Sequence, residues 1–149
     1  MISIAELTVL TVEELEEECV WINHRDAPDD VVKCLSDCVG RVDECKPLWK
    51  GDVLWVKYQN EEYELPLEGS STDCYSLIHS VASIWDGLYE VRILRSTLDS
   101  DTHAFLILSC AMWQKIDLKC AIWSTDFFEK LKPGWDYFNK TQVPIIAFE

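Results

Sequence analysis

The stretch LYEVRILRSTLDSDTHAFLIL, residues 88–108, decides the fold. Its first half alternates apolar with charged side chains, the period of a strand with one buried face, over Tyr89, Glu90, Val91, Arg92 and Ile93. Residues 104–108 form an unbroken apolar run, which is typical of a strand buried on both faces. Polar, turn-forming residues 96–103 connect the two. We therefore expect a β-hairpin whose second strand lies inside a sheet.

The rest of the chain predicts strands and helices in mixed order. In sequence we expect a short strand over 2–10, a helix over 11–22, a helix from 28 that Gly40 ends, a connection over 47–51, a hairpin over 52–67, a helix over 73–85, a helix from 110, a helix over 126–131 and a strand over 143–148. No regular strand-helix-strand alternation appears. This order predicts one α+β domain, residues 1–149, with a mainly antiparallel sheet built on the central hairpin and helices packed against it.

Charge is the strongest compositional signal. The chain has 27 acidic and 13 basic residues, a net charge of −14, and residues 1–30 hold nine of the acids with a single base. A surface of this sign repels phosphate backbones and attracts basic proteins, so we expect no direct nucleic-acid binding. No stretch approaches the roughly 20 apolar residues of a membrane span, and the N-terminus does not resemble a secretory signal. We expect a cytoplasmic protein without a membrane contact.

The seven cysteines predict free thiols, because their number is odd and the chain is longer than the small scaffolds that need bridges. A zinc site is the alternative, assembled from Cys19, His24, Cys34, Cys38 and Cys45. Strong zinc patterns repeat a tight Cys pair, which this sequence does not do. We therefore expect thiols that behave as small buried hydrophobes, with no metal and no cofactor.

The predicted helix over 11–22 combines acidic side chains with a tryptophan. Thr11 and Glu14 form a capping-box pattern at its start. On the side opposite its apolar face lie Glu14, Glu17 and Glu18, and Trp21 follows the last two at helical spacing. We expect Trp21 beside acid on the surface; packing on a neighbouring helix is the alternative.

The predicted hairpin over 52–67 places a second tryptophan similarly. It turns near Asn60, and one face holds Leu54, Val56, Tyr58, Tyr63 and Leu65. The other face holds Trp55, Glu62 and Glu64 together with Lys57. We therefore expect a partner-binding surface made of Glu14, Glu17, Glu18, Trp21, Trp55, Glu62 and Glu64.

Motifs for catalysis are absent from the sequence. It has no Gly-rich phosphate loop, no His pair at metal spacing and no Gly-x-Ser-x-Gly elbow. Asp99, Asp101 and His103 offer a divalent-ion alternative, although carboxylates at this spacing usually form a turn. We expect no catalytic residues and a protein that is not an enzyme; an unrecognised small enzyme stays open as an alternative.

The acidic character, the segments Tyr89-Glu-Val-Arg-Ile-Leu and Asp101-Thr-His-Ala-Phe-Leu-Ile-Leu, and the following Trp113 resemble bacterial immunity proteins of polymorphic or contact-dependent toxin systems. The resemblance implies a non-enzymatic inhibitor that binds a cognate basic toxin domain, frequently a nuclease, and occludes its active or substrate-binding surface. A phosphate-mimicking antagonist of a nucleic-acid-binding protein is the alternative from another class.

Overall fold

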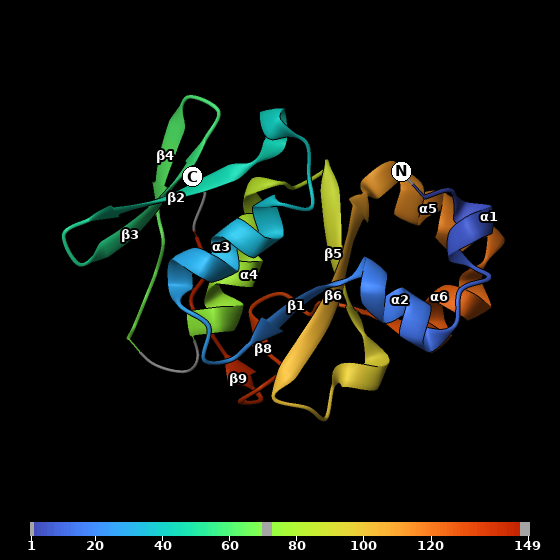
Figure 1. Ribbon diagram of the computed structural model, residues 1–149. Coiled ribbons are helices and arrows are strands. Elements are labelled where there is room, and N and C mark those ends of the chain that lie inside the picture. The colour runs from blue at the N-terminus through green and yellow to red at the C-terminus, as the bar shows by residue number, and fades with distance from the viewer. Residues whose placement is uncertain (1, 70–72, 147–149) are drawn as a thin grey trace.

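The computed structural model describes residues 2–69 and 73–146. Its helices are α1 (Ile4–Leu7), α2 (Val12–Glu18), α3 (Pro28–Ser36), α4 (Asp73–Ile84), α5 (Cys110–Lys119) and α6 (Ala121–Phe127), with short 3-10 helices η1 (Arg41–Asp43) and η2 (Arg95–Thr97). Its strands are β1 (Val20–Asn23), β2 (Cys45–Lys50), β3 (Val53–Tyr58), β4 (Glu61–Glu64), β5 (Tyr89–Leu94), β6 (Thr102–Ser109), β7 (Phe128–Lys130), β8 (Trp135–Asp136) and β9 (Thr141–Gln142). Figure 1 shows their arrangement.

The central hairpin is confirmed. Strands β5 and β6 pair antiparallel within a four-stranded sheet of order β1-β6-β5-β7, so the apolar β6 is interior as the sequence predicts. Strands β2, β3 and β4 form a second antiparallel sheet, and β8 pairs with β9. Helices and antiparallel sheets in this order make an α+β fold. Among the described residues, no helix is long and apolar enough to cross a bilayer.

The four-stranded sheet is covered on both faces, and each face has its own core. Val91, Ile93 and Phe105 belong to the larger core, together with residues of α3 and α4. The opposite face contributes to a second core, which α1, α2 and α5 complete. Figure 1 shows the sheet between these two groups, with α3 and α4 to one side and α1, α2, α5 and α6 to the other.

This second core corrects the expectation that β5 has one solvent face. Arg92 is only 3% exposed. Its guanidinium lies over the ring of Trp113, 4.0 Å from the centroid, and donates to both Asp117 carboxylate oxygens at 2.8 and 2.7 Å. The Glu90 carboxylate accepts a further hydrogen bond from the Arg92 Nε. Successive side chains of β5 therefore point to two faces that are both buried, and one of these faces holds the Arg92 ion pair.

The N-terminal predictions are partly wrong. Residues 2–10 are not a strand, because Ser3 and Glu6 form a capping box that starts α1. The box at Thr11 and Glu14 starts α2 as predicted. This helix ends at Glu18 instead of continuing to residue 22, and the β-branched and aromatic residues that follow pair with β6 as β1.

The expected connection over 47–51 is also wrong. Strand β2 runs through Pro47, which an edge strand tolerates because the missing N–H can face away from the neighbouring strand. Only Gly51, at φ 63°, and Asp52 form the turn into β3. The predicted hairpin is confirmed as β3 and β4, in a register that pairs Trp55 with Glu64 and Lys57 with Glu62.

The last third departs from prediction at two places. The expected helix over 126–131 is wrong: α6 ends at Phe127, and residues 128–130 extend as β7 against β5. Residues 143–146 form no strand, although Val143 and Ile146 are buried, and 147–148 lie outside the described residues. The predicted helices over 73–85 and from 110 are confirmed, and Gly87 at φ 81° follows the first of them.

Candidate protein-binding surface

Trp21 lies at the junction of α2 and β1, on an edge of the four-stranded sheet. Its side of β1 faces α2, and its indole Nε1 donates to the Glu16 carbonyl oxygen at 2.9 Å. The same carbonyl, one of the last of the helix, also accepts from the Cys19 N–H at 3.3 Å. The residue is nevertheless 41% exposed. The ring is thus fixed in place with part of its surface in water.

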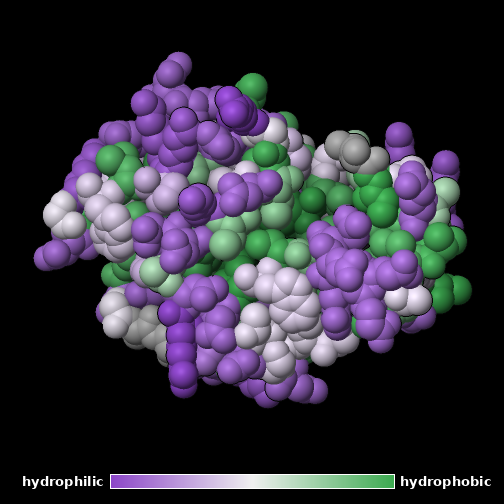
Figure 2. Space-filling view, viewed as in Figure 1, coloured by the Kyte–Doolittle hydropathy of each residue, from purple (hydrophilic) through white to green (hydrophobic). Residues whose placement is uncertain are grey.

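Acidic residues of α2 line a hollow together with this ring. A shallow hollow is lined by Glu13, Glu16, Glu17, Cys19 and Trp21, which we call the Trp21 surface. Figure 2 shows hydrophilic side chains gathered over α2. The prediction that Trp21 lies beside acid on the surface is confirmed, although the residue belongs to a strand and not to the helix.

The carboxylates at the end of α2 are unfavourable for the helix. Glu16, Glu17 and Glu18 are its last three residues, and its last turn has no basic residue. A negative charge at a helix C-terminus opposes the macrodipole, at a cost of about 0.3–1 kcal/mol each. Glu13 and Glu17 add a like-charge pair at i and i+4, which costs about 0.2–0.5 kcal/mol. The arrangement therefore does not stabilise the free protein.

Two acidic residues that were predicted to belong to this surface, Glu14 and Glu18, do not line the hollow. The Glu14 carboxylate accepts from the Thr11 backbone N–H at 3.0 Å, so it caps the helix. Glu18 is exposed at the end of α2 but does not line the hollow. The structure adds Glu13 and Glu16, which the sequence interpretation missed because it continued the helix past Glu18. A β-prone Val20-Trp21-Ile22 after the acidic run was the available signal.

Trp55 lies on the other sheet and has a different environment. Its neighbours across the strands are Leu48 and Glu64. The Lys50 ammonium lies 4.2 Å from its ring centroid and also bonds Glu62 at 2.9 Å. The half-buried ring therefore already has a cation against it.

The predicted acidic face around Trp55 is mixed in charge. Because β2 is a strand, its Lys46 and Lys50 lie on the same face as Lys57, Glu62 and Glu64. Three lysines against two glutamates leave no acidic excess there. Trp21 and Trp55 are on separate sheets, and α3 packs against both β1 and β2. The two tryptophans consequently do not form one surface, and Trp21 is the stronger candidate.

Metal-binding residues are not gathered within residues 2–69 and 73–146, where no group of three or more His, Cys, Asp or Glu side chains is placed to hold an ion. The alternative with Asp99, Asp101 and His103 has a specific obstacle. The His103 ring is fully buried, its Nδ1 lies 2.6 Å from the Tyr75 hydroxyl, and it stacks on Phe138. A ring held in the core in this way cannot join the carboxylates of the turn.

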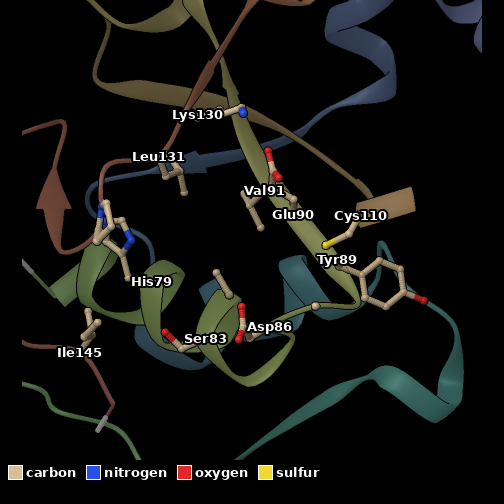
Figure 3. Close-up of a pocket in the computed structure, with 13 residues that line it drawn as sticks. His79, Ser83, Asp86, Tyr89, Glu90, Val91, Cys110, Lys130, Leu131 and Ile145 are labelled. Atoms are coloured by element: carbon tan, nitrogen blue, oxygen red, sulfur yellow. The ribbon is translucent and has the colours of Figure 1, made fainter. Parts of the chain in front are cut away.

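Nucleophilic residues occur in a separate pocket between α4 and β5, where Cys110 and His79 both line the wall (Figure 3). Burial raises the pKa of the Cys110 thiol, and the nearby Glu90 and Asp86 carboxylates raise it further. Burial also lowers the pKa of His79, whose Nε2 lies 2.8 Å from the Trp135 carbonyl oxygen. A thiol whose pKa is raised in this way stays protonated near neutral pH, which disfavours Cys110 as a nucleophile.

A scan against protein-family models gave no match, and searches of curated proteins and of solved structures found no protein similar to this chain.

Proposed function

We propose that this protein is a non-enzymatic inhibitor, an immunity protein that binds a cognate basic toxin domain, such as a nuclease, and occludes its active or substrate-binding surface. The observation that carries the proposal is the Trp21 surface, where a fixed, part-exposed indole and three glutamates line one hollow. The net charge of −14 supports a basic partner. We further propose that the protein acts in the cytoplasm.

The Trp21 surface fits an arginine or lysine side chain of the partner. An indole face attracts a guanidinium or ammonium group, and carboxylates at the rim of the same hollow pair with it. Trp and Arg are also the residues in which interface energy most often concentrates. Because the Glu16 carbonyl holds Nε1, the ring needs little reordering on binding. We expect the partner to insert an arginine here.

The electrostatic cost at the end of α2 supports a role in binding. Acidic residues that destabilise the free helix are compensated when a cation docks against them. Glu17→Lys should therefore leave the free protein as stable or a few tenths of a kcal/mol more stable, while binding weakens by at least about tenfold. Glu61→Lys, at an exposed position of the β3–β4 hairpin, is the matched control for the charge change. Lower stability with unchanged binding in Glu17→Lys would contradict this role.

The experiment that tests the proposed function begins with the reading frame adjacent to the gene of this protein. Its product should inhibit growth when expressed alone, and co-expression of this chain should restore growth. Trp21→Ala should reduce that protection, whereas Trp49→Ala should not; Trp49 is the matched control because its exposure is 45% against 41% for Trp21. Full protection by Trp21→Ala, or a neighbouring product that this chain neither binds nor inhibits, would refute the proposal.

Charge should act mainly on the rate of association. Between about 50 and 500 mM salt the Debye length contracts from roughly 14 to 4 Å, so long-range attraction is largely screened. The on-rate for the toxin domain should fall markedly over this range, whereas the off-rate changes less. An on-rate independent of salt would remove charge from the mechanism.

A further inference from the structure

The pocket between α4 and β5 has a volume of about 490 Å³ and lies outside the Trp21 surface (Figure 3). Small-molecule sites typically have volumes of about 300–1,000 Å³. Val91, Leu131, Pro133 and Ile145 contribute an apolar wall. The register of β7 places Leu131 opposite Val91, so the chain itself covers the strand edge here. The pocket therefore suits a compact ligand and not an added strand.

The wall formed by α4 and the turn after it has a row of polar side chains. His79, Ser83 and Asp86 follow one another at i, i+4 and i+7, the spacing at which helix residues share a face. All three line the pocket, and Figure 3 shows them on its α4 side. A helix face that packs toward a sheet is usually apolar. Core packing therefore does not explain this row.

His79 contributes a hydrogen-bond acceptor to the row. The residue is 6% exposed, and its Nε2 lies 2.8 Å from the Trp135 carbonyl oxygen. Because a carbonyl oxygen only accepts, Nε2 carries the proton and Nδ1 of the neutral ring keeps a lone pair. Burial lowers the pKa of His79, which favours the neutral form. No donor from residues 2–69 or 73–146 bonds to Nδ1.

The other two side chains of the row also have unused acceptors. Within the described part of the chain, no hydrogen bond or ion pair engages the Ser83 hydroxyl or the Asp86 carboxylate. Glu90 also lines the pocket but differs, because its carboxylate is bonded to Arg92. Asp86 lies just beyond the end of α4, where a negative charge opposes the helix macrodipole. A cation bound at Asp86 would offset this charge.

We propose that this pocket binds a small organic amine, which has an apolar body with an ammonium group at one end and a hydroxyl donor at the other. The ammonium group pairs with Asp86 and bonds the Ser83 hydroxyl, three residues away on the same face. At a rise of about 1.5 Å per residue, His79 lies roughly 10 Å from Asp86 along the helix, so the hydroxyl at the far end of the ligand donates to Nδ1. The apolar body between these two ends lies against Val91 and Leu131.

The charges of the pocket favour this orientation of the ligand. Figure 3 shows Lys130 and Asp86 at opposite ends of the pocket. The Lys130 ammonium lies 3.8 Å from the Asp117 carboxylate, outside the polar row. The ammonium group of the ligand is therefore attracted to the Asp86 end and repelled from the Lys130 end.

The test compares three probes of similar shape by calorimetry. Tyramine has both the ammonium and the hydroxyl group, 2-phenylethylamine lacks the hydroxyl, and 4-(2-hydroxyethyl)phenol replaces the ammonium by a neutral alcohol. A protein of net charge −14 attracts any cation, so the titrations are made at about 150 mM salt, where exposed charges are largely screened. Tyramine should bind at least about fivefold more tightly than 2-phenylethylamine and about tenfold more tightly than the neutral alcohol. Equal affinity for the three probes, or no binding of tyramine, would overturn the proposal.

Variants and a spectroscopic signal locate the site. Asp86→Asn should weaken tyramine binding by about tenfold without loss of stability, because it removes a charge that opposes the macrodipole; Asp126→Asn, at an exposed position of α6, is the matched control. Ala82→Phe fills the pocket and should also weaken binding. In the wild-type protein, tyramine should shift the ¹⁵N resonance of His79 Nδ1 more than 2-phenylethylamine does.

Tyramine binding that is equal in wild type and Asp86→Asn, or an unchanged Nδ1 resonance at saturation, would refute the site. The inference does not depend on the proposed function. Trp21→Ala should therefore leave tyramine binding unchanged, which separates a failure of this proposal from a failure of the Trp21 surface.

Discussion

Asp117→Ala should destabilise the protein by uncovering the buried charge of Arg92. The Arg92 side chain is 4% exposed, and Asp117 accepts two of its hydrogen bonds at 2.8 and 2.7 Å. Each charge-assisted bond is worth about 1.5–3 kcal/mol. Asp117 is one-third exposed and Glu90 remains a partner, so we expect a total loss of about 2–3 kcal/mol. For a chain of this size that loss lowers Tm by about 4–12 °C.

Urea unfolding of Asp117→Ala, Arg92→Met and the double variant measures this effect. Met fills much of the Arg volume without charge, so the double variant should be at least about 1 kcal/mol more stable than the sum of the single losses predicts. Asp126→Ala, exposed on α6, should stay within about 0.5 kcal/mol of wild type. A loss below about 0.5 kcal/mol in Asp117→Ala, with no coupling, would refute the account of this ion pair.

The same pair predicts a pH dependence. The hydrogen bonds from Arg92 hold the pKa of Asp117 below its ordinary value. The stability it contributes is therefore present above the unfolded pKa of about 3.9 and is lost as pH falls through the lower folded value. The difference in unfolding free energy between wild type and Asp117→Ala should shrink in acid, and a constant difference down to pH of about 2 would contradict this.

Three further outcomes follow from the buried contacts. Ser36→Ala should cost about 2–3 kcal/mol in urea unfolding, because the buried hydroxyl donates to the Cys45 carbonyl at 2.7 Å and accepts from the Cys45 N–H at 2.8 Å; a neutral change would mean that water replaces both bonds. Burial lowers the pKa of His103, which the Tyr75 hydroxyl contacts. The neutral imidazole therefore contributes its full stability above the unfolded pKa of about 6.5, and this stability is lost as the pH falls through the lower folded pKa. Thermal melts between about pH 8 and 5 should show a weaker pH dependence of Tm in His103→Gln than in wild type, and an equal dependence would contradict this prediction. Burial raises the pKa of Cys45 and Cys74 to about 12, so mass spectrometry should find both alkylated only after unfolding, and rapid labelling of the native protein would contradict this.

The central hairpin and the β3–β4 hairpin could be predicted from the sequence because their signals are local. Period-two alternation over 89–93 and an apolar run over 104–108 define strands whatever surrounds them. The capping box at Thr11 likewise fixes the start of α2 from residues three apart. These features require no knowledge of distant contacts.

The remaining features depend on tertiary pairing. In the sequence, Val20–Asn23 continues the helical pattern of the preceding residues, and it becomes a strand because it pairs with β6. Pro47 is tolerated in β2 because that strand lies at the edge of its sheet. Arg92 occupies a polar position in an alternating strand, and it is buried because α5 packs there and brings the ring of Trp113 against its guanidinium. The same limits apply to the candidate surface. The sequence pattern identifies Trp21, but Glu13 and Glu16 lie next to it only because α2 ends at Glu18.

The affinity of the adjacent gene product for Trp21→Ala and Trp49→Ala, measured by calorimetry with wild type alongside, tests the central claim most directly. Both tryptophans are exposed to a similar extent, at 41% and 45%. Of the two, Trp21 is the one that lines a hollow with glutamates of α2. We predict that Trp21→Ala weakens binding by at least one decade, about 1.4 kcal/mol, with its melting transition retained and with Trp49→Ala close to wild type. Equal affinity of all three proteins, or a loss in Trp49→Ala alone, would contradict the claim that the Trp21 surface binds the partner.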